Sequence, residues 1–141
     1  MGAESVWSFV GRIRPKERCV LVGDQMSDVH VDSHVLATLR DVMEDEYALL
    51  LETFLTDSDE RLRLLRETEA QADALAMRMA AHSFKGSCSN MGAVLLAGLC
   101  KQLEDLARRE QLDGVAALLA HIEREFAIVR ILFKSERQRH R

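Results

Sequence analysis

The sequence has few of the residues that build sheets, tight turns or disulfide scaffolds. Its 141 residues include one proline, one tryptophan and one tyrosine, and aromatic side chains make up 5%. Strands draw on aromatic and β-branched residues, whereas the Leu, Ala, Glu and Arg that dominate here favour helices. The hydrophobic fraction of 48% is enough for a core, and the length fits one domain. We therefore expect a single all-α domain.

Three further absences narrow the classes of function. The formal net charge is −4, so the chain lacks the basic footprint of a general nucleic-acid binder. Its three cysteines, Cys19, Cys88 and Cys100, form neither a CxxC pair nor an even set, which favours a reducing cytoplasm. No apolar run approaches the length of a membrane span. We expect a cytoplasmic protein that binds neither nucleic acid nor membrane.

Residues 1–25 show neither helical nor strand periodicity. They mix apolar and basic side chains, but the charges do not precede the apolar stretch as they do in a signal peptide. Val6 breaks the pattern for myristoylation at Gly2. We expect residues 1–31 to be a disordered extension, part of which could be the product of an upstream start codon.

Apolar residues at helical spacing divide the remaining chain into five segments. The first is short and begins near Asp32 or Ser33, either of which can cap a helix. Four longer amphipathic segments follow, over about 45–69, 74–89, 93–109 and 115–133. Long helices with short connections imply antiparallel neighbours. The sequence thus predicts an up-down-up-down four-helix bundle over 32–134 with a short additional N-terminal helix, and a monomer is the default for this architecture.

Local signals indicate where these helices begin and end. Asp73 and Asp113 are suitable N-caps for the third and fifth segments. Gly92 is free to take the positive φ of a tight turn after the third. Residues 135–141 form a polar, basic tail that we expect to fray.

The third predicted helix carries a narrow polar face. At about 100° per residue, this face contains Arg78, His82, Lys85 and Ser89. The opposite side is predicted to contain Ala76, Met79, Ala80, Phe84 and Met91. His82 thus lies mid-helix on the polar stripe, which argues against a core histidine. Periodicity alone leaves open an ordinary surface histidine.

Two neighbours of His82 favour a chemical role. Lys85 lies at i+3, within reach for side-chain contact. Gly86 lies at i+4, in a helix interior where glycine costs about 1 kcal/mol relative to alanine. The missing side chain leaves room beside His82 for a bulky group or an approaching protein. Close packing against a neighbouring helix is the alternative explanation of this glycine.

The run AHSFKGSCSNMGA over residues 81–93 resembles the signature of histidine-containing phosphotransfer domains. The shared skeleton is a histidine, Lys-Gly at the third and fourth positions after it, small polar residues, and Gly-Ala. The continuation resembles the family too, through Leu99-Cys100, Leu103-Glu104 and Arg108. Cys88 and Ala107 depart from it, standing where serine and glycine are common. The likeness extends from about Ser33 to Phe133 once helix order is included.

This resemblance implies a phosphoryl carrier in a multistep phosphorelay. His82 would accept phosphate from an aspartyl-phosphate receiver domain, such as that of a hybrid sensor kinase, and pass it to the receiver of a response regulator. Lys85 would offset the charge of the phosphoryl group, and Glu104 would hydrogen-bond the ring and fix its tautomer. Gly86 and Ser87 would shape the site.

The expected partner surface combines the polar stripe with the first helix. Its candidate residues are Arg78, Ser89, Leu36 and Leu39, although the two leucines also suit the core. The chain has no Walker A loop and no glycine-rich nucleotide lid, so we expect a carrier and not a kinase. We expect no cofactor or metal of its own, with Mg²⁺ supplied by the receiver.

Two other functions stay open from the sequence. One is a helical adaptor that binds receiver domains without carrying phosphate. The other is metal binding, because His30 and His34 are spaced i, i+4 with Asp28 and Asp32 close by. The helix start at Asp32 places His30 outside the helix, which disfavours this second function.

Overall fold

A computed structural model describes residues 30–140, which form five α-helices, two short 3-10 helices and no strand. The short 3-10 helices span Glu44–Glu46 and Leu112–Gly114. The α-helices are α3 (Ser33–Met43), α4 (Tyr47–Ala70), α5 (Ala74–Asn90), α6 (Val94–Arg108) and α7 (Val115–Arg139). These bounds lie close to the predicted ones, because each helix buries an apolar stripe at helical spacing.

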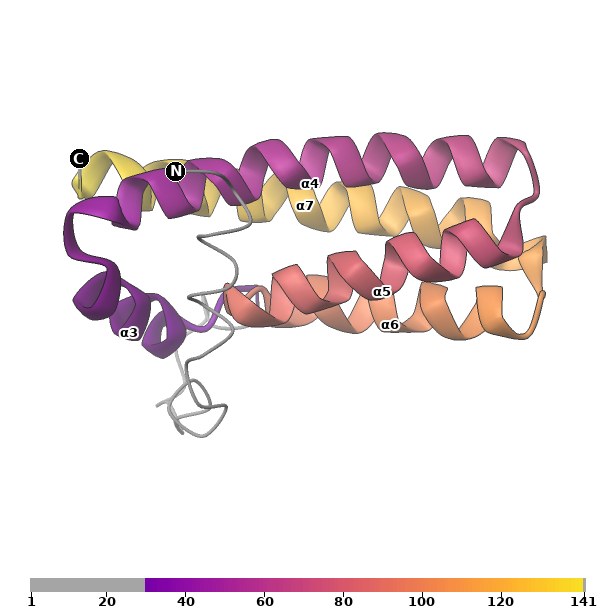
Figure 1. Cartoon of the computed structure of the whole chain (residues 1–141), viewed down its shortest axis with the longest axis horizontal. Coiled ribbons are helices and arrows are strands. Elements are labelled where there is room, and N and C mark those ends of the chain that lie inside the picture. The colour runs from indigo at the N-terminus through magenta and orange to yellow at the C-terminus, as the bar shows by residue number, and fades with distance from the viewer. Residues whose placement is uncertain (1–29, 141) are drawn as a thin grey trace.

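The four long helices lie side by side, and short α3 sits at one end of the bundle (Figure 1). α4 packs against α5 and α7, and α6 packs against the same two helices, so the four close into a ring. Successive long helices run in opposite directions (Figure 1). The predicted up-down-up-down bundle with an additional short helix is confirmed.

One continuous core runs through the bundle and draws on all five α-helices. Phe54 of α4 anchors it, with ring centroids 5.2 Å from Phe133 and 6.4 Å from Phe126, both on α7. Phe84 of α5 and Leu103 of α6 are fully buried from the other side. α5 therefore has one face fixed in the core, and the residues on its opposite face point outward.

The turn between α5 and α6 fixes the relative position of these two helices and holds α3. Gly92 has φ of 76°, as predicted, and a Cβ there would lie 2.9 Å from Val35 Cβ. The Asp32 N–H donates to the Gly92 carbonyl at 2.8 Å. Only glycine allows both this backbone conformation and the close approach of α3.

Two of the three predicted caps are confirmed. Asp32 accepts from the His34 N–H at 2.9 Å, and Asp73 accepts from the Ala76 N–H at 3.0 Å. The prediction for Asp113 is wrong. That residue lies inside the 3-10 helix Leu112–Gly114, and the cap position of α7 falls on Gly114 without a side-chain bond.

Both ends of the folded part extend further than predicted. Val31 is 5% exposed, and His30 Nδ1 lies 2.8 Å from Oε2 of buried Glu125, so the folded part begins before residue 32. α7 continues through the predicted frayed tail to Arg139, because Glu136 turns inward and accepts a hydrogen bond from the Tyr47 hydroxyl at 2.7 Å. The remainder of the predicted extension, residues 1–29, lies outside the described residues.

Within 30–140, none of the helices has the length and apolarity needed to cross a membrane.

Candidate functional site

His82 projects from the middle of α5 into solvent. Its side chain is 68% exposed, whereas its neighbour Ala81 and the aromatic residue Phe84 are fully buried. The buried side chains anchor the helix, so the imidazole is displayed from a rigid support. A ring held in this way is accessible to a macromolecular partner.

Glu104 joins His82 and Lys85 through its two carboxylate oxygens. Oε2 lies 2.8 Å from His82 Nδ1, and Oε1 accepts from Lys85 Nζ at 2.8 Å. Glu104 comes from α6 and is 12% exposed, so the ring is held at the junction of two helices. The contact predicted for Glu104 is present.

The charge state of Glu104 determines the tautomer of His82. The hydrogen bond from Lys85, and after it the one to His82, lower the pKa of the Glu104 carboxyl below its usual range. The carboxylate is then ionised at neutral pH and can only accept hydrogen bonds. Nδ1 of the neutral ring must therefore carry the proton. The lone pair of Nε2 is left free on an exposed ring.

Gly86 lies on the solvent side of α5, one turn after His82. A Cβ placed there would meet no atom within 4 Å. Packing against a neighbouring helix therefore does not explain this glycine. The open surface beside the imidazole is the remaining reason for a costly residue at this position.

The other predicted site residues have different surroundings. Arg78 and Ser89 are exposed on α5, as their spacing predicts. Ser87 is 9% exposed and lies on the packed side of the helix, away from the surface around the ring. The prediction that Leu36 and Leu39 form a partner surface is wrong, because they are 8% and 0% exposed. Both leucines pack in the core, together with Val35 and Met43 of the same helix.

Sequence reasoning missed two exposed apolar residues on α5. Leu75 and Met79 are 65% and 64% exposed, although Met79 was predicted on the buried side. At 100° per residue they lie about 20° and 60° round the helix from His82. The buried stripe is centred on Met77, Ala81 and Phe84, and Met79 lies on the opposite side of the helix from these three residues. His82 thus lies between a polar ridge and an apolar one.

A shallow hollow continues from this face toward the start of α5. Its volume is about 230 Å³, and it lies between the first turn of α5 and the last turn of α6. Its lining comprises Ala74, Leu75, Arg78, Ala107, Arg108 and Glu110. Arginine and leucine side chains therefore line a depression one to two turns from His82.

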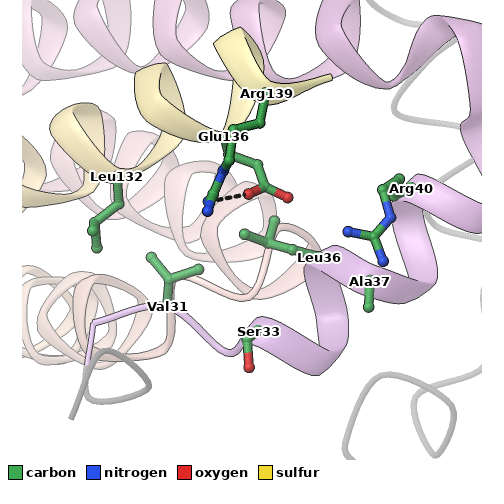
Figure 2. Close-up of a pocket in the computed structure, with 8 residues that line it drawn as sticks. All are labelled: Val31, Ser33, Leu36, Ala37, Arg40, Leu132, Glu136 and Arg139. Carbon is green, nitrogen blue, oxygen red and sulfur yellow. Dashed lines mark hydrogen bonds and ion pairs between the residues drawn. The ribbon is translucent and has the colours of Figure 1, made fainter. Parts of the chain in front are cut away.

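Another hollow and the suspected metal ligands lie away from His82. A cavity of about 210 Å³ separates α3 from the last turns of α7, and none of its lining residues belongs to α5 or α6 (Figure 2). Residues 30–140 hold no group of three or more His, Cys, Asp or Glu side chains placed for a metal. His30 is paired with Glu125, Asp32 caps α3, and Asp28 lies outside the described part.

Comparison with known proteins bears on the same segment of the chain. A model of the Hpt domain family matches residues 49–131, which include α5, α6 and the linked residues His82, Lys85 and Glu104. The chain belongs to the histidine-containing phosphotransfer family. Hpt domains are phosphotransfer carriers of phosphorelays and not kinases, and this chain has their four-helix fold.

A solved Hpt structure is similar over most of the chain. It is the crystal structure of histidine-containing phosphotransfer protein B from Pseudomonas aeruginosa PAO1, with 62% sequence identity and a TM-score of 0.78. The match covers 79% of this chain and 97% of that one. Among curated proteins, none matches the chain.

Proposed function

We propose that His82 accepts a phosphoryl group from an aspartyl-phosphate receiver domain and passes it to a second receiver. The observation that supports this most directly is the 2.8 Å contact between His82 Nδ1 and Glu104 Oε2. It fixes the proton on Nδ1 and leaves an unprotonated Nε2 on a ring that is 68% exposed.

Phosphoryl transfer to His82 requires no general base from this chain, because Nε2 carries no proton. The Nε2 lone pair attacks phosphorus, the N–P bond forms, and the P–O bond to the aspartyl carboxylate breaks. The aspartate leaves with the electron pair, while the imidazole keeps its Nδ1 proton and becomes positively charged. Glu104 stabilises that charge as it develops. The reverse sequence delivers the group to the next aspartate.

The remaining requirements are positioning and charge. Lys85 lies one turn from His82 and can offset negative charge on the phosphoryl oxygens, although it is also bonded to Glu104. The acidic pocket and its Mg²⁺ belong to the receiver. The carrier therefore needs no cofactor of its own.

The surface around His82 fits the face of a receiver. Exposed Leu75 and Met79 offer apolar contact on one side, while Arg78 and Arg108 line the adjoining hollow. These cations complement the carboxylates of a receiver's phosphorylation pocket. We propose docking as a monomer in the cytoplasm, first to the receiver of a hybrid sensor kinase and then to that of a response regulator.

The proposal is tested with a phosphorylated receiver as donor. The wild-type chain should take up label that is labile to acid and stable to base, as expected of phosphohistidine. His82→Gln should lose at least about 100-fold of the uptake, since His30, the other histidine of residues 30–140 whose Nδ1 contacts a glutamate, is only 30% exposed. His121→Gln, which changes an exposed histidine of α7, is the matched control and should label like wild type. Label that persists in His82→Gln would overturn the proposal, and binding without any labelling would establish the adaptor function instead.

A further inference from the structure

Arg61 reaches from α4 to the residue next to His82. Its Nη1 donates to Ser83 Oγ at 2.7 Å. Ser83 lies about 100° round α5 from His82 in one direction, and Lys85 lies about 60° in the other. α4 and α6 both pack against α5. Arg61 therefore contacts α5 on one side of His82, and Lys85 lies on the other.

The positive charge of Lys85 is already neutralised by Glu104 before His82 is phosphorylated. Lys85 and Glu104 form an ion pair, and Glu104 also bonds the ring of His82. Together these side chains carry no net charge while the imidazole is neutral. A phosphoryl group adds between one and two negative charges, and Glu104 opposes them. The phosphorylated ring is itself positive and pairs with Glu104, so His82, Lys85 and Glu104 together supply one net positive charge against up to two negative charges on the phosphoryl group.

Arg61 differs in its partners from the other arginines of α4. Arg63 pairs with Glu60 and Glu67, and Arg66 pairs with Glu69 and Glu123. Between residues 30 and 140, Arg61 has no ion pair, and its one hydrogen bond goes to a neutral hydroxyl.

Arg61 is also partly buried, and its Nε is fully covered with no partner among the described residues. Covering a guanidinium without an anion costs free energy. A phosphoryl anion would offset this cost. The planar guanidinium of arginine matches the oxygens of a phosphate and stays charged at every physiological pH.

We propose that Arg61 binds the phosphoryl group carried by His82, exchanging its hydrogen bond to Ser83 for one to a phosphoryl oxygen. The inference rests on the proposed function of His82. No covalent bond changes in this exchange. Arg61 is then the α4 side of a two-cation clamp whose other side is Lys85, and it distinguishes the phosphorylated carrier from the free one.

The test measures the ionisation of the phosphoryl group in the intact chain. Phosphoramidate, a small phosphoryl donor, loads His82 without a docked partner, and ³¹P NMR then follows the phosphohistidine resonance against pH at low salt. The principal variant is Arg61→Gln, which keeps a donor for Ser83 but removes the charge. Its titration midpoint should rise by about half a pH unit or more, because a guanidinium hydrogen-bonded to the phosphoryl group favours the dianion. Arg61→Lys should restore most of the wild-type midpoint.

Arg63→Gln is the matched control, since it removes the same charge from the exposed side of α4 and should leave the midpoint unchanged. Thermal unfolding of each variant confirms that it is folded, and a merely structural Arg61 would alter that transition without moving the ³¹P midpoint. Equal midpoints in wild type, Arg61→Gln and Arg63→Gln would overturn the inference while the proposed function stands. Absence of the phosphohistidine signal from the wild-type chain would overturn both.

Discussion

Glu104 is the residue on which the chemistry of the site depends, although it does not touch the transferred group. One of its oxygens fixes the proton of His82 and the other holds Lys85. A glutamine at this position can still accept from Nδ1, but it cannot stabilise a positive ring or form an ion pair. The effect of the charge can therefore be separated from the effect of the hydrogen bond.

We predict that Glu104→Gln slows phosphoryl uptake from a receiver by about tenfold or more, since hydrogen bonds to charged groups contribute about 1.5–3 kcal/mol. Single-turnover transfer rates at saturating receiver measure this effect. Asp105→Asn, the neighbouring acid on α6, pairs with Lys101 and Arg108 and is the control. Identical rates for Glu104→Gln and wild type would show that the carboxylate charge has no part in transfer.

The same variant has a pH signature in stability. The pKa of Glu104 is lowered by folding, chiefly through Lys85, so its contribution is fully present above the pKa of an unfolded carboxyl. That contribution is lost as the pH falls through the lowered, folded-state pKa. The gap in unfolding free energy between wild type and Glu104→Gln should therefore be largest near neutral pH and close in acid. Urea titrations at several pH values measure it, and a gap independent of pH would contradict this account.

At the scale of the helix, Gly86 makes α5 less stable than alanine would and leaves the surface beside His82 open. Gly86 is exposed, is helical and has no neighbour that a methyl group would strike. Alanine at this position should thus suit the isolated protein better than glycine does. The methyl group would stand one turn from His82, where we propose that the receiver docks.

We predict that Gly86→Ala raises the free energy of unfolding by up to about 1 kcal/mol and lowers the rate of phosphoryl transfer. Gly98→Ala is a close control, because Gly98 is also an exposed glycine inside a helix, and a methyl group added there would meet nothing within 4 Å. It should be stabilised similarly and transfer phosphate normally. Loss of transfer in both variants, or in neither, would remove the docking explanation of Gly86.

Helix positions and two of the three caps followed from the sequence, but not every helix boundary did. Asp113 has the right chemistry for a cap, yet a 3-10 turn shifts the start of α7 past it. The hydrogen bond between Glu136 and Tyr47 joins residues 89 positions apart, so no local pattern reveals it. Met79 was misplaced because small residues, such as Ala81, define the buried face of α5 as much as large ones do.

Across the whole molecule, α4 and α7 are joined at the end of the bundle beside α3. The Tyr47 hydroxyl is buried and donates to Glu136 Oε2 at 2.7 Å, and the His140 ring meets the Tyr47 ring edge-on with centroids 5.5 Å apart. Burial, and then the bond to Glu136, raise the pKa of Tyr47 well above its usual range. The phenol therefore remains a donor throughout the physiological range.

We predict that Tyr47→Phe lowers the free energy of unfolding by about 1–3 kcal/mol, because a buried carboxylate loses one of its two hydrogen-bond donors, Arg139 being the other. Phosphoryl transfer at temperatures where the variant is folded should be unchanged, since His82 lies on α5 in the middle of the bundle. Thr56→Ala removes an exposed hydroxyl bond from the same helix and should cost less. Chemical unfolding measures the free energy of unfolding of both variants. Equal losses would show that the buried hydrogen bond stabilises the fold no more than the exposed one does.

Sequence alone predicted the bundle and the stripe that carries His82, because both depend on residues close together in the chain. The Arg61–Ser83 contact and the buried state of Leu36 were not predictable in this way, because each depends on how distant helices pack. The family signature located Glu104, although spacing could not show which way its side chain turns.

The turn at Gly92 sets the rotational phase of α6 relative to α5. One residue inserted or deleted between the two helices would rotate α6 by about 100°, enough to carry Glu104 away from His82 while every side chain named in the site stays intact. The length of the loop between α5 and α6 therefore determines whether Glu104 can contact His82. A related sequence with the same histidine, lysine and glutamate but a different separation between the two helices would keep the motif and lose the mechanism.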